Sequence, residues 1–201
     1  MSGRFITFEG IDGAGKSTHI SWFAQQLASR GHELVITREP GGTALGEKLR
    51  DLLLSDPMSI ESETLLMFAA RMEHLDKLIL PAIRRGAWVI CDRFTDSTYA
   101  YQGGGRALPL SRIATLEHWV QQGLQPDRTY LFDLPADLAA ARRAQARAAD
   151  RFEAEDLEFF DKVRCAYLHR VEQDPSRFMV IDSQQGIEEI QAILKKDIAS
   201  L

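Results

Sequence analysis

Ten residues near the start of the chain, EGIDGAGKST at positions 9–18, restrict its fold more than any other feature. They place three glycines within six positions, followed by a lysine and two hydroxyl residues, directly after the apolar run Phe5–Phe8. Glycine weakens both helices and strands, so such a cluster requires a specific reason. The stretch matches the pattern G-x-x-x-x-G-K-[ST] between an apolar run and a helical pattern. This match predicts a loop whose backbone N–H groups surround a chain of phosphates.

The predicted phosphate loop also carries side chains suited to nucleotide chemistry. Lys16 is expected to reach the β- and γ-phosphates, and Ser17 is expected to bind Mg²⁺. GTPases, ATPases and kinases share this pattern, so it predicts a nucleoside triphosphate site and not a reaction. The guanine-reading pattern N-K-x-D requires asparagine, which the chain lacks. The residues predicted to hold the nucleotide are Gly10, Ile11, Asp12, Gly13, Ala14, Gly15, Lys16, Ser17 and Thr18.

Short apolar runs alternate with longer helical patterns along the chain, which is typical of a parallel sheet covered by helices on both faces. The sequence predicts five strands, over 4–9, 33–38, 88–92, 129–134 and 178–182. It predicts helices over 16–30, 61–85 with a kink at Pro81, 110–122, 136–174 in two pieces, and 186–200. We therefore expect an α/β fold with three layers (α/β/α), a five-stranded parallel sheet and right-handed crossovers.

The composition limits the class of protein. With 201 residues, 45% of them hydrophobic, we expect a single domain spanning 1–201. The net charge of −5, without a lysine-rich tail, disfavours a nucleic-acid or membrane partner. Two cysteines without disulfide or metal spacing, and no long apolar run, favour a cytoplasmic location.

Two further motifs follow predicted strands. Arg38 ends the second strand and begins the turn Thr37–Thr43, which contains Pro40 between Glu39 and two glycines. Asp92 and Arg93 end the third strand. Because ligands of open α/β sheets bind at the carboxyl ends of strands, these charges are expected at the site. Asp92 is predicted to hold Mg²⁺ or orient an oxygen, and Arg93 to bridge two phosphates. The alternatives are a solvated arginine and an ion pair that closes a strand.

The predicted helices contribute two more features. Phe68 and Arg71 are three residues apart and share a helix face, which suits stacking on a base and reading one of its carbonyl groups. A core position is the alternative for Phe68. Arg143, Arg147 and Arg151 are spaced by four, so they form a stripe of like charge. The stripe indicates either a solvated face or a mobile lid, over about 137–156, that closes on polyphosphate.

Taken together, these motifs resemble one family, the thymidylate kinases of bacteria. The matching segments are Gly10–Ser17, TREPGGT at 37–43, LLMFAAR at 65–71, DRFTDSTYAYQGGGR at 92–106 and DRFE at 150–153. The resemblance implies a P-loop NTPase-type fold and phosphate transfer from ATP to dTMP, which gives dTDP for dTTP synthesis, with Mg²⁺. It also implies a homodimer, built on the long helices.

The resemblance also implies roles for individual residues. Arg38 and Arg93 would hold the dTMP phosphate, Phe68 would stack on thymine, and Arg71 would bond a thymine carbonyl. Tyr101 would exclude a 2′-hydroxyl, and Arg143 or Arg147 would supply charge in the transition state. The residues implied near the acceptor are Asp12, Pro40 after a bond that is often cis in the family, Ser97, Thr98, Gln102 and Glu158.

The chemistry follows from the acceptor. A phosphate oxygen is already anionic near neutral pH, so no strong general base is required, and Asp92 is assigned to metal binding or orientation. Lys16, Arg93, the lid arginines and Mg²⁺ would supply positive charge. The alternative functions are another nucleotide or deoxynucleoside kinase and a non-catalytic ATP-binding module. The acidic net charge and the acceptor motifs disfavour the module.

Overall fold

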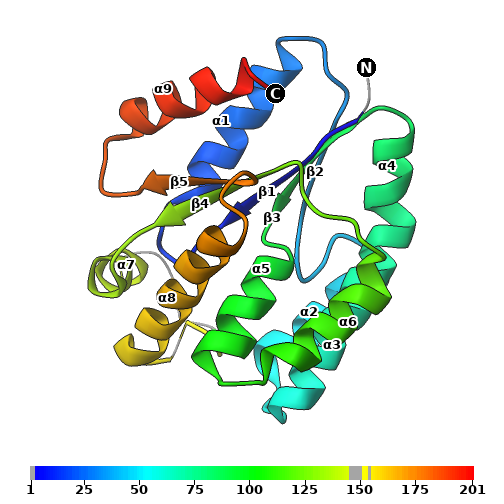
Figure 1. Ribbon diagram of the computed structural model, residues 1–201, viewed down its shortest axis with the longest axis vertical. Helices are drawn as coiled ribbons and strands as arrows, with labels where there is room; N and C mark the ends of the chain where they lie inside the picture. Colours follow the sequence, from blue (N-terminus) through cyan, green and yellow to red (C-terminus); the bar gives the residue numbers. More distant parts are fainter. Residues whose placement is uncertain (1–2, 145–150, 154) are drawn as a thin grey trace.

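A computed structural model describes residues 3–144, 151–153 and 155–201, and forms a single five-stranded sheet between two layers of helices (Figure 1). The strands are β1 (Phe5–Glu9), β2 (Leu34–Arg38), β3 (Trp88–Asp92), β4 (Arg128–Asp133) and β5 (Phe178–Asp182). All are parallel, in the order β2-β3-β1-β4-β5. The predicted fold class is confirmed, and each predicted strand agrees with the observed one to within one residue at either end.

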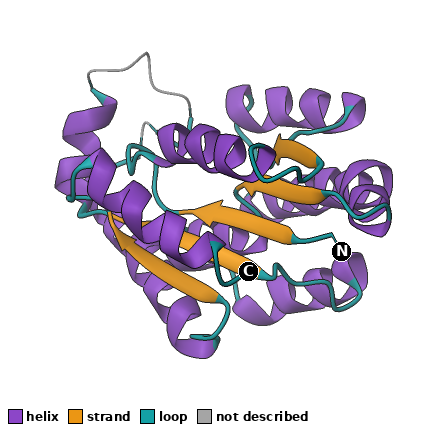
Figure 2. Cartoon of the chain, turned by 90° about the horizontal axis from the view of Figure 1, so that it is seen from above, coloured by secondary structure: helices purple, strands orange, loops and turns teal. Residues whose placement is uncertain are grey.

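The helices alternate with the strands along the chain. Figure 2 shows helices on both sides of the strands. They are α1 (Lys16–Ala28), α2 (Ala44–Ser55), α3 (Ile60–His74), η1 (Leu75–Ile79), α4 (Leu80–Arg84), α5 (Thr95–Thr98), η2 (Tyr99–Gly105), α6 (Leu110–Gln121), α7 (Ala136–Arg143), α8 (Leu157–Gln173) and α9 (Ile187–Ile198). α1 and α9 cover one face of the sheet, and α5, α6 and α8 lie on the other (Figure 1). Among the described residues, none of the helices has the length and apolar character needed to cross a membrane.

Three parts of the helical layers differ from the prediction. The sequence predicts no helix over Ala44–Ser55, where α2 forms with Thr43 as its N-cap. It also predicts none over 95–105, where α5 continues into the π-helix η2 despite three consecutive glycines. The predicted helix 61–85 consists of α3, the π-helix η1 and α4. η1 ends two residues before Pro81, where the sequence predicts a kink.

The alternation of side chains along β1 divides the core and directs one polar residue toward the site. Ile6 and Phe8 face α1, where Phe8 packs edge-to-face on Phe23 at 5.4 Å. Phe5 faces the opposite side and packs on Phe94 at 4.9 Å. Glu9 follows Phe5 at an even spacing, so its carboxylate lies on the same side of the sheet as α5 and α8.

Two glycines of η2, Gly104 and Gly105, permit its close approach to α8. An added Cβ at Gly104 would overlap the Cβ of Ala166, and one at Gly105 would overlap the ring of Phe159. This close contact fixes the position of η2, which carries Tyr101 and Gln102.

We expect Gly104→Ala to lower the free energy of unfolding by about 1–3 kcal/mol, because α8 must move to admit the methyl group. Urea denaturation followed by circular dichroism measures the change. Gly186→Ala is the matched control, since its added Cβ meets nothing closer than 3.4 Å and its φ is −66°. Equal stability of Gly104→Ala and the wild type would contradict the proposed packing constraint.

Candidate active site

The phosphate loop joins β1 to α1 and has the conformation that its glycines allow. Gly13 and Gly15 have φ values of 87° and 89°, in the left-handed region, and α1 begins at Lys16. Gly15, Ser17 and Thr18 are exposed at the mouth of the loop, and Ile11 and Ala14 are buried beneath it. Backbone donors and the positive end of a helix therefore meet at one exposed place, which suits a phosphate chain.

Lys16 lies within this loop. Its Nζ donates hydrogen bonds to the backbone oxygens of Gly10, at 3.0 Å, and Ile11, at 3.2 Å. The residue is 6% exposed. Burial, and then the nearby charge of Arg93, lower the pKa of the Lys16 amine from its ordinary value. A phosphate at the loop would offer this amine an anionic partner in place of two neutral carbonyls.

A hollow beside the loop, which we call the β2–β3 hollow, brings together Ser17, Arg38 and Asp92. The Oδ1 atom of Asp92 is buried and has no hydrogen-bond partner among the described residues. Arg38 donates to Glu47 Oε2 at 2.8 Å with its side chain 53% exposed. The free carboxylate oxygen and the Ser17 hydroxyl are oxygen ligands of the type that Mg²⁺ prefers. In the described part of the chain, no cluster of three or more His, Cys, Asp or Glu could hold a metal without other ligands.

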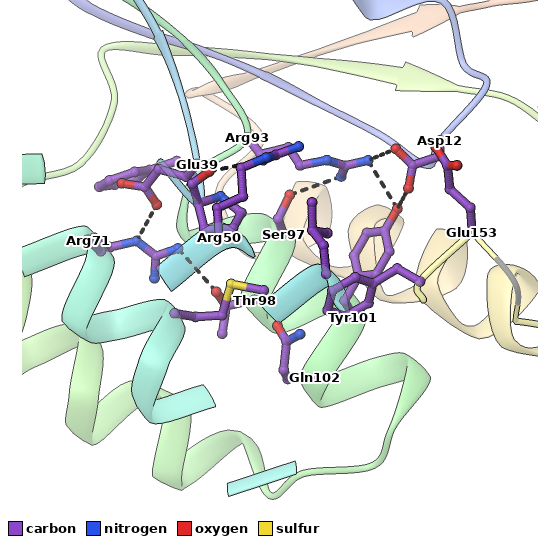
Figure 3. Close-up of a pocket in the computed structure, with 15 residues that line it drawn as sticks. Asp12, Glu39, Arg50, Arg71, Arg93, Ser97, Thr98, Tyr101, Gln102 and Glu153 are labelled. Atoms are coloured by element: carbon purple, nitrogen blue, oxygen red, sulfur yellow. Dashed lines mark hydrogen bonds and ion pairs between the residues drawn. The ribbon is translucent and has the colours of Figure 1, made fainter. Parts of the chain in front are cut away.

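A second cavity, which we call the acceptor pocket, lies beside the phosphate loop and has Asp12 and Arg93 in its lining (Figure 3). Its walls come from the phosphate loop, the turn after β2, the helices α2 and α3, the segment after β3, α5 and η2, and residues 152–153. Of the residues that the sequence predicts for substrate binding, those that line it are Asp12, Pro40, Arg71, Arg93, Ser97, Thr98, Tyr101 and Gln102. The bond between Glu39 and Pro40 is cis.

Arg93 occupies the end of the acceptor pocket nearest the phosphate loop (Figure 3). Its Nη2 donates to Asp12 Oδ1 at 2.7 Å and to the Tyr101 hydroxyl at 3.1 Å, and its Nη1 donates to Ser97 Oγ at 3.2 Å. Burial alone would raise the pKa of Asp12, but the charges of Arg93 and Lys16 hold it well below its usual range. Arg93 is therefore a fixed cation between the phosphate loop and the acceptor pocket.

Arg71 occupies the other end of the acceptor pocket (Figure 3). Its Nε donates to Glu39 Oε2 at 2.7 Å, and its Nη2 donates to Thr98 Oγ1 at 3.1 Å. Glu39 is also bonded to His74 Nδ1 at 2.9 Å, so the carboxylate is held from two sides. The Nη1 of Arg71 is buried without a hydrogen-bond partner in the described ranges. This donor is oriented and available to a carbonyl oxygen.

Three residues expected at the acceptor lie elsewhere, and Arg38 in the β2–β3 hollow is one of them. Phe68 is 2% exposed in the core and does not line the pocket, and the Arg71 guanidinium lies 4.7 Å from its ring centroid. Met67, four residues before Arg71, lines the pocket instead. Glu158 is 76% exposed on α8 and pairs with Lys162 at 2.7 Å. The base-stacking role expected for Phe68 and the sugar contact expected for Glu158 do not fit these positions.

The structure adds Glu9, which the sequence analysis did not select. Its Oε1 accepts a hydrogen bond from the backbone of Phe94 at 2.7 Å, and its Oε2 accepts bonds from Ser97, at 2.6 Å, and Tyr167, at 2.9 Å. Burial, and then the charge of Asp96, raise the pKa of Glu9 to about 7. Glu9 thus holds the segment after β3, in which Arg93 has a φ of 68°. A charged residue at the end of an apolar strand was the available signal.

The end of α7 lies over the phosphate loop. Arg143 Nη1 donates to the backbone oxygen of Asp12 at 2.8 Å, and the guanidinium stacks 3.9 Å from the ring centroid of Phe160. Arg142 donates to the backbone oxygen of Ser183 at 3.0 Å. Arg147, the other arginine predicted to supply charge, lies outside the described residues.

Arg93 lies between the phosphate loop and a pocket that contains oriented hydrogen-bond donors. This arrangement defines a nucleotide kinase of the P-loop class. A family model described as thymidylate kinase matches residues 8–193. The thymidylate kinase of Ralstonia nicotianae is 58% identical and that of Cupriavidus metallidurans 60% identical, each over 100% of both chains. The crystal structure of thymidylate kinase from Ehrlichia chaffeensis is similar with a TM-score of 0.80 and 34% identity, and the match covers 98% of this chain and 99% of that chain.

The chain belongs to the thymidylate kinase family, whose members phosphorylate dTMP to dTDP with ATP. The predicted resemblance is confirmed.

Proposed function

We propose that this chain transfers the γ-phosphoryl group of ATP to dTMP at the boundary between the phosphate loop and the acceptor pocket. The observation that carries the proposal is the position of Arg93, which is bonded to Asp12 of the loop at 2.7 Å and lines the pocket. A single guanidinium placed there contacts the phosphates of both nucleotides. The chain acts as one domain, with the segment at about 137–156 as a lid that excludes water during transfer.

On the donor side, the residues Gly10–Thr18 bind the ATP phosphates through backbone N–H groups. Lys16 exchanges its two carbonyl partners for the β- and γ-phosphates. Ser17 and Asp92 hold Mg²⁺, which neutralises charge on the phosphates when it is bound. The buried, unpaired Oδ1 of Asp92 supports this assignment.

On the acceptor side, Arg93 binds the dTMP phosphate and Arg71 donates its free Nη1 to a thymine carbonyl. Met67 takes the contact with the base face that Phe68 does not reach. Tyr101 lies where the sugar fits, and Ser97, Thr98, Gln102 and Pro40 complete the walls. Arg38 reaches the phosphate only after leaving Glu47, since its side chain now lies in the β2–β3 hollow.

The acceptor oxygen needs no general base because it is anionic near neutral pH. The chain contributes in-line placement and positive charge, from Lys16, Arg93 and Arg143. Asp12 keeps Arg93 in place through the bond between their side chains.

A coupled assay of ADP release with dTMP, dUMP, dCMP, dGMP and thymidine tests the function. We expect dTMP to be the best substrate and thymidine to be inactive, because a nucleoside lacks the phosphate that Arg93 binds. ADP release that prefers thymidine would favour a deoxynucleoside kinase. A rate of ADP release that none of the five compounds changes would favour an ATP-binding module.

Met67 and Phe68 give a paired prediction. Met67→Ala is expected to raise the KM for dTMP about tenfold with little loss of stability, because it removes a pocket wall. Phe68→Ala is expected to lower the free energy of unfolding by about 3–5 kcal/mol, because it opens a cavity in the core. Steady-state kinetics and urea denaturation of both variants measure these effects. The assignment is wrong if Phe68→Ala is stable and binds dTMP poorly.

We also propose a homodimer built on α3 and α6, in a cytoplasmic enzyme. Leu65 on α3 is 55% exposed, and Leu110 and Trp119 on α6 are 46% and 67% exposed. α3 and α6 pack against each other, and Arg112 pairs with Glu61 between them at 3.2 Å. Exposed apolar side chains on two adjacent helices suit contact with a second copy. Sedimentation at micromolar concentration should give twice the chain mass.

The proposed cytoplasmic location is supported by two free cysteines, Cys91 and Cys165.

A further inference from the structure

One buried acid beside the acceptor pocket has no role in the mechanism above. Glu63 lies on α3, four residues before Met67 and eight before Arg71, so the three side chains share one face of the helix. Glu63 itself is 0% exposed. Its Oε1 accepts a hydrogen bond of 2.8 Å from Nε2 of Gln102, which lines the pocket.

This hydrogen bond fixes which end of the Gln102 amide faces the pocket. A carboxylate only accepts hydrogen bonds, so the NH₂ group of Gln102 must be the end that faces Glu63. The carbonyl oxygen of Gln102 is then left on the pocket side. Figure 3 shows the side chain of Gln102 extending from η2 toward the pocket, with its amide at the upper end. Without Glu63, the amide could take either orientation.

Two arginines pair with Glu63 by charge. Arg151 Nη2 lies 2.7 Å from Oε2 and Arg106 Nε lies 3.6 Å from Oε1, although neither contact has hydrogen-bond geometry. Arg151 is anchored in turn by two bonds to the backbone oxygen of Leu53, at 3.0 and 2.8 Å. The charge of the carboxylate is therefore compensated by groups that do not line the pocket.

We propose that Glu63 is a specificity-determining positioning residue that selects the base of the acceptor through Gln102. This inference rests on the proposed function. The carbonyl of Gln102 accepts a hydrogen bond, and the free Nη1 of Arg71 donates one. An acceptor beside a donor matches a pyrimidine that has an N3–H next to a C4 carbonyl, as in thymine. It opposes cytosine, which has an unprotonated N3 next to an amino group.

The test compares dTMP with 5-methyl-dCMP, because their bases differ only along the edge that contains N3 and the C4 substituent. In Glu63→Gln, Arg151 is a donor, so it favours the orientation in which the oxygen of the new amide faces Arg151. The NH₂ group of the new amide then faces Gln102. Gln102 must then present its carbonyl to position 63 and its NH₂ to the pocket. We expect kcat/KM for dTMP to fall about tenfold to a hundredfold, mostly through KM. The preference for dTMP over 5-methyl-dCMP should fall at least about tenfold.

Three further variants separate this role from a structural one. Glu155→Gln removes the partner of Arg106 at 2.7 Å and should leave the preference unchanged. Gln102→Leu removes the acceptor and should lose the preference by itself, whether or not Glu63→Gln folds. Adding Glu63→Gln to Gln102→Leu should change the preference less than about twofold, because the effect passes through Gln102.

The inference is overturned if Gln102→Leu keeps the preference for dTMP over 5-methyl-dCMP. It is also overturned if Glu63→Gln lowers kcat/KM equally for the two substrates. It is also overturned if Glu155→Gln gives the same loss of preference as Glu63→Gln. A wild-type enzyme that does not phosphorylate dTMP would contradict the proposed function instead.

Discussion

Lys16→Ala is expected to lower kcat by about a thousandfold, because it removes the positive charge that stabilises the phosphoryl group during its transfer. The amine is already enclosed by the phosphate loop, where it bonds Gly10 and Ile11 at 3.0 and 3.2 Å. A charge held in place before the substrate arrives needs little rearrangement during the reaction. The KM for dTMP should change less than about threefold, since Lys16 does not line the acceptor pocket. Single-turnover and steady-state assays with saturating ATP measure the change.

Stability is the control for this variant. Lys16→Ala loses two hydrogen bonds within the loop, so its thermal unfolding should be compared with that of the wild type. A folded variant with kcat within tenfold of the wild type would remove Lys16 from the catalytic residues.

Arg143→Ala is the second large effect that we expect, with kcat reduced by about a thousandfold and the KM for dTMP nearly unchanged. Arginines that stabilise charge during phosphoryl transfer contribute about 10³–10⁵ in rate. Arg143 lies at the right place for this role, since it bonds the backbone oxygen of Asp12 at 2.8 Å and lies over the phosphate loop. Its stacking on Phe160, at 3.9 Å, holds the guanidinium there.

Arg142→Ala is the matched control for Arg143→Ala. The two residues are adjacent, but Arg142 bonds the backbone of Ser183 at the end of β5 instead of Asp12. We expect Arg142→Ala to alter the KM for ATP more than kcat. If both variants keep normal turnover, the charge in the transition state comes from elsewhere in the chain.

The strands were predictable from sequence because parallel strands buried on both faces are short apolar runs. The helix α2 was missed although Leu45, Leu49, Leu52 and Leu53 follow a helical spacing, because the glycines at 41 and 42 mark a loop and Gly46 interrupts the pattern. η2 was not predictable from local preference, since Gly103–Gly105 disfavour a helix in isolation. It forms because only glycine permits the approach to α8.

The site was predictable where a motif fixes the backbone. Arg93 and Arg71 lie where the strand end and the helix face place them. Spacing does not separate Met67 from Phe68, because residues three and four before Arg71 both lie beside it. Which of the two side chains faces the core depends on how α3 packs against the rest of the protein. That packing is a feature of the tertiary structure and is not set by spacing along the helix. For Glu9, the only local signal is a charge at the end of an apolar strand, and its partner Ser97 is distant in sequence. Glu63 acts through Gln102, which is also distant in sequence, so no local pattern identifies Glu63.

The pairing of Arg93 with Asp12 has a consequence for turnover. The cation that receives the acceptor phosphate already has a carboxylate partner at 2.7 Å, so part of its charge is neutralised before the phosphate binds. A partly neutralised cation attracts a phosphate less strongly than an unpaired one does. The retained pairing with Asp12 therefore favours rapid release of dTDP over tight retention.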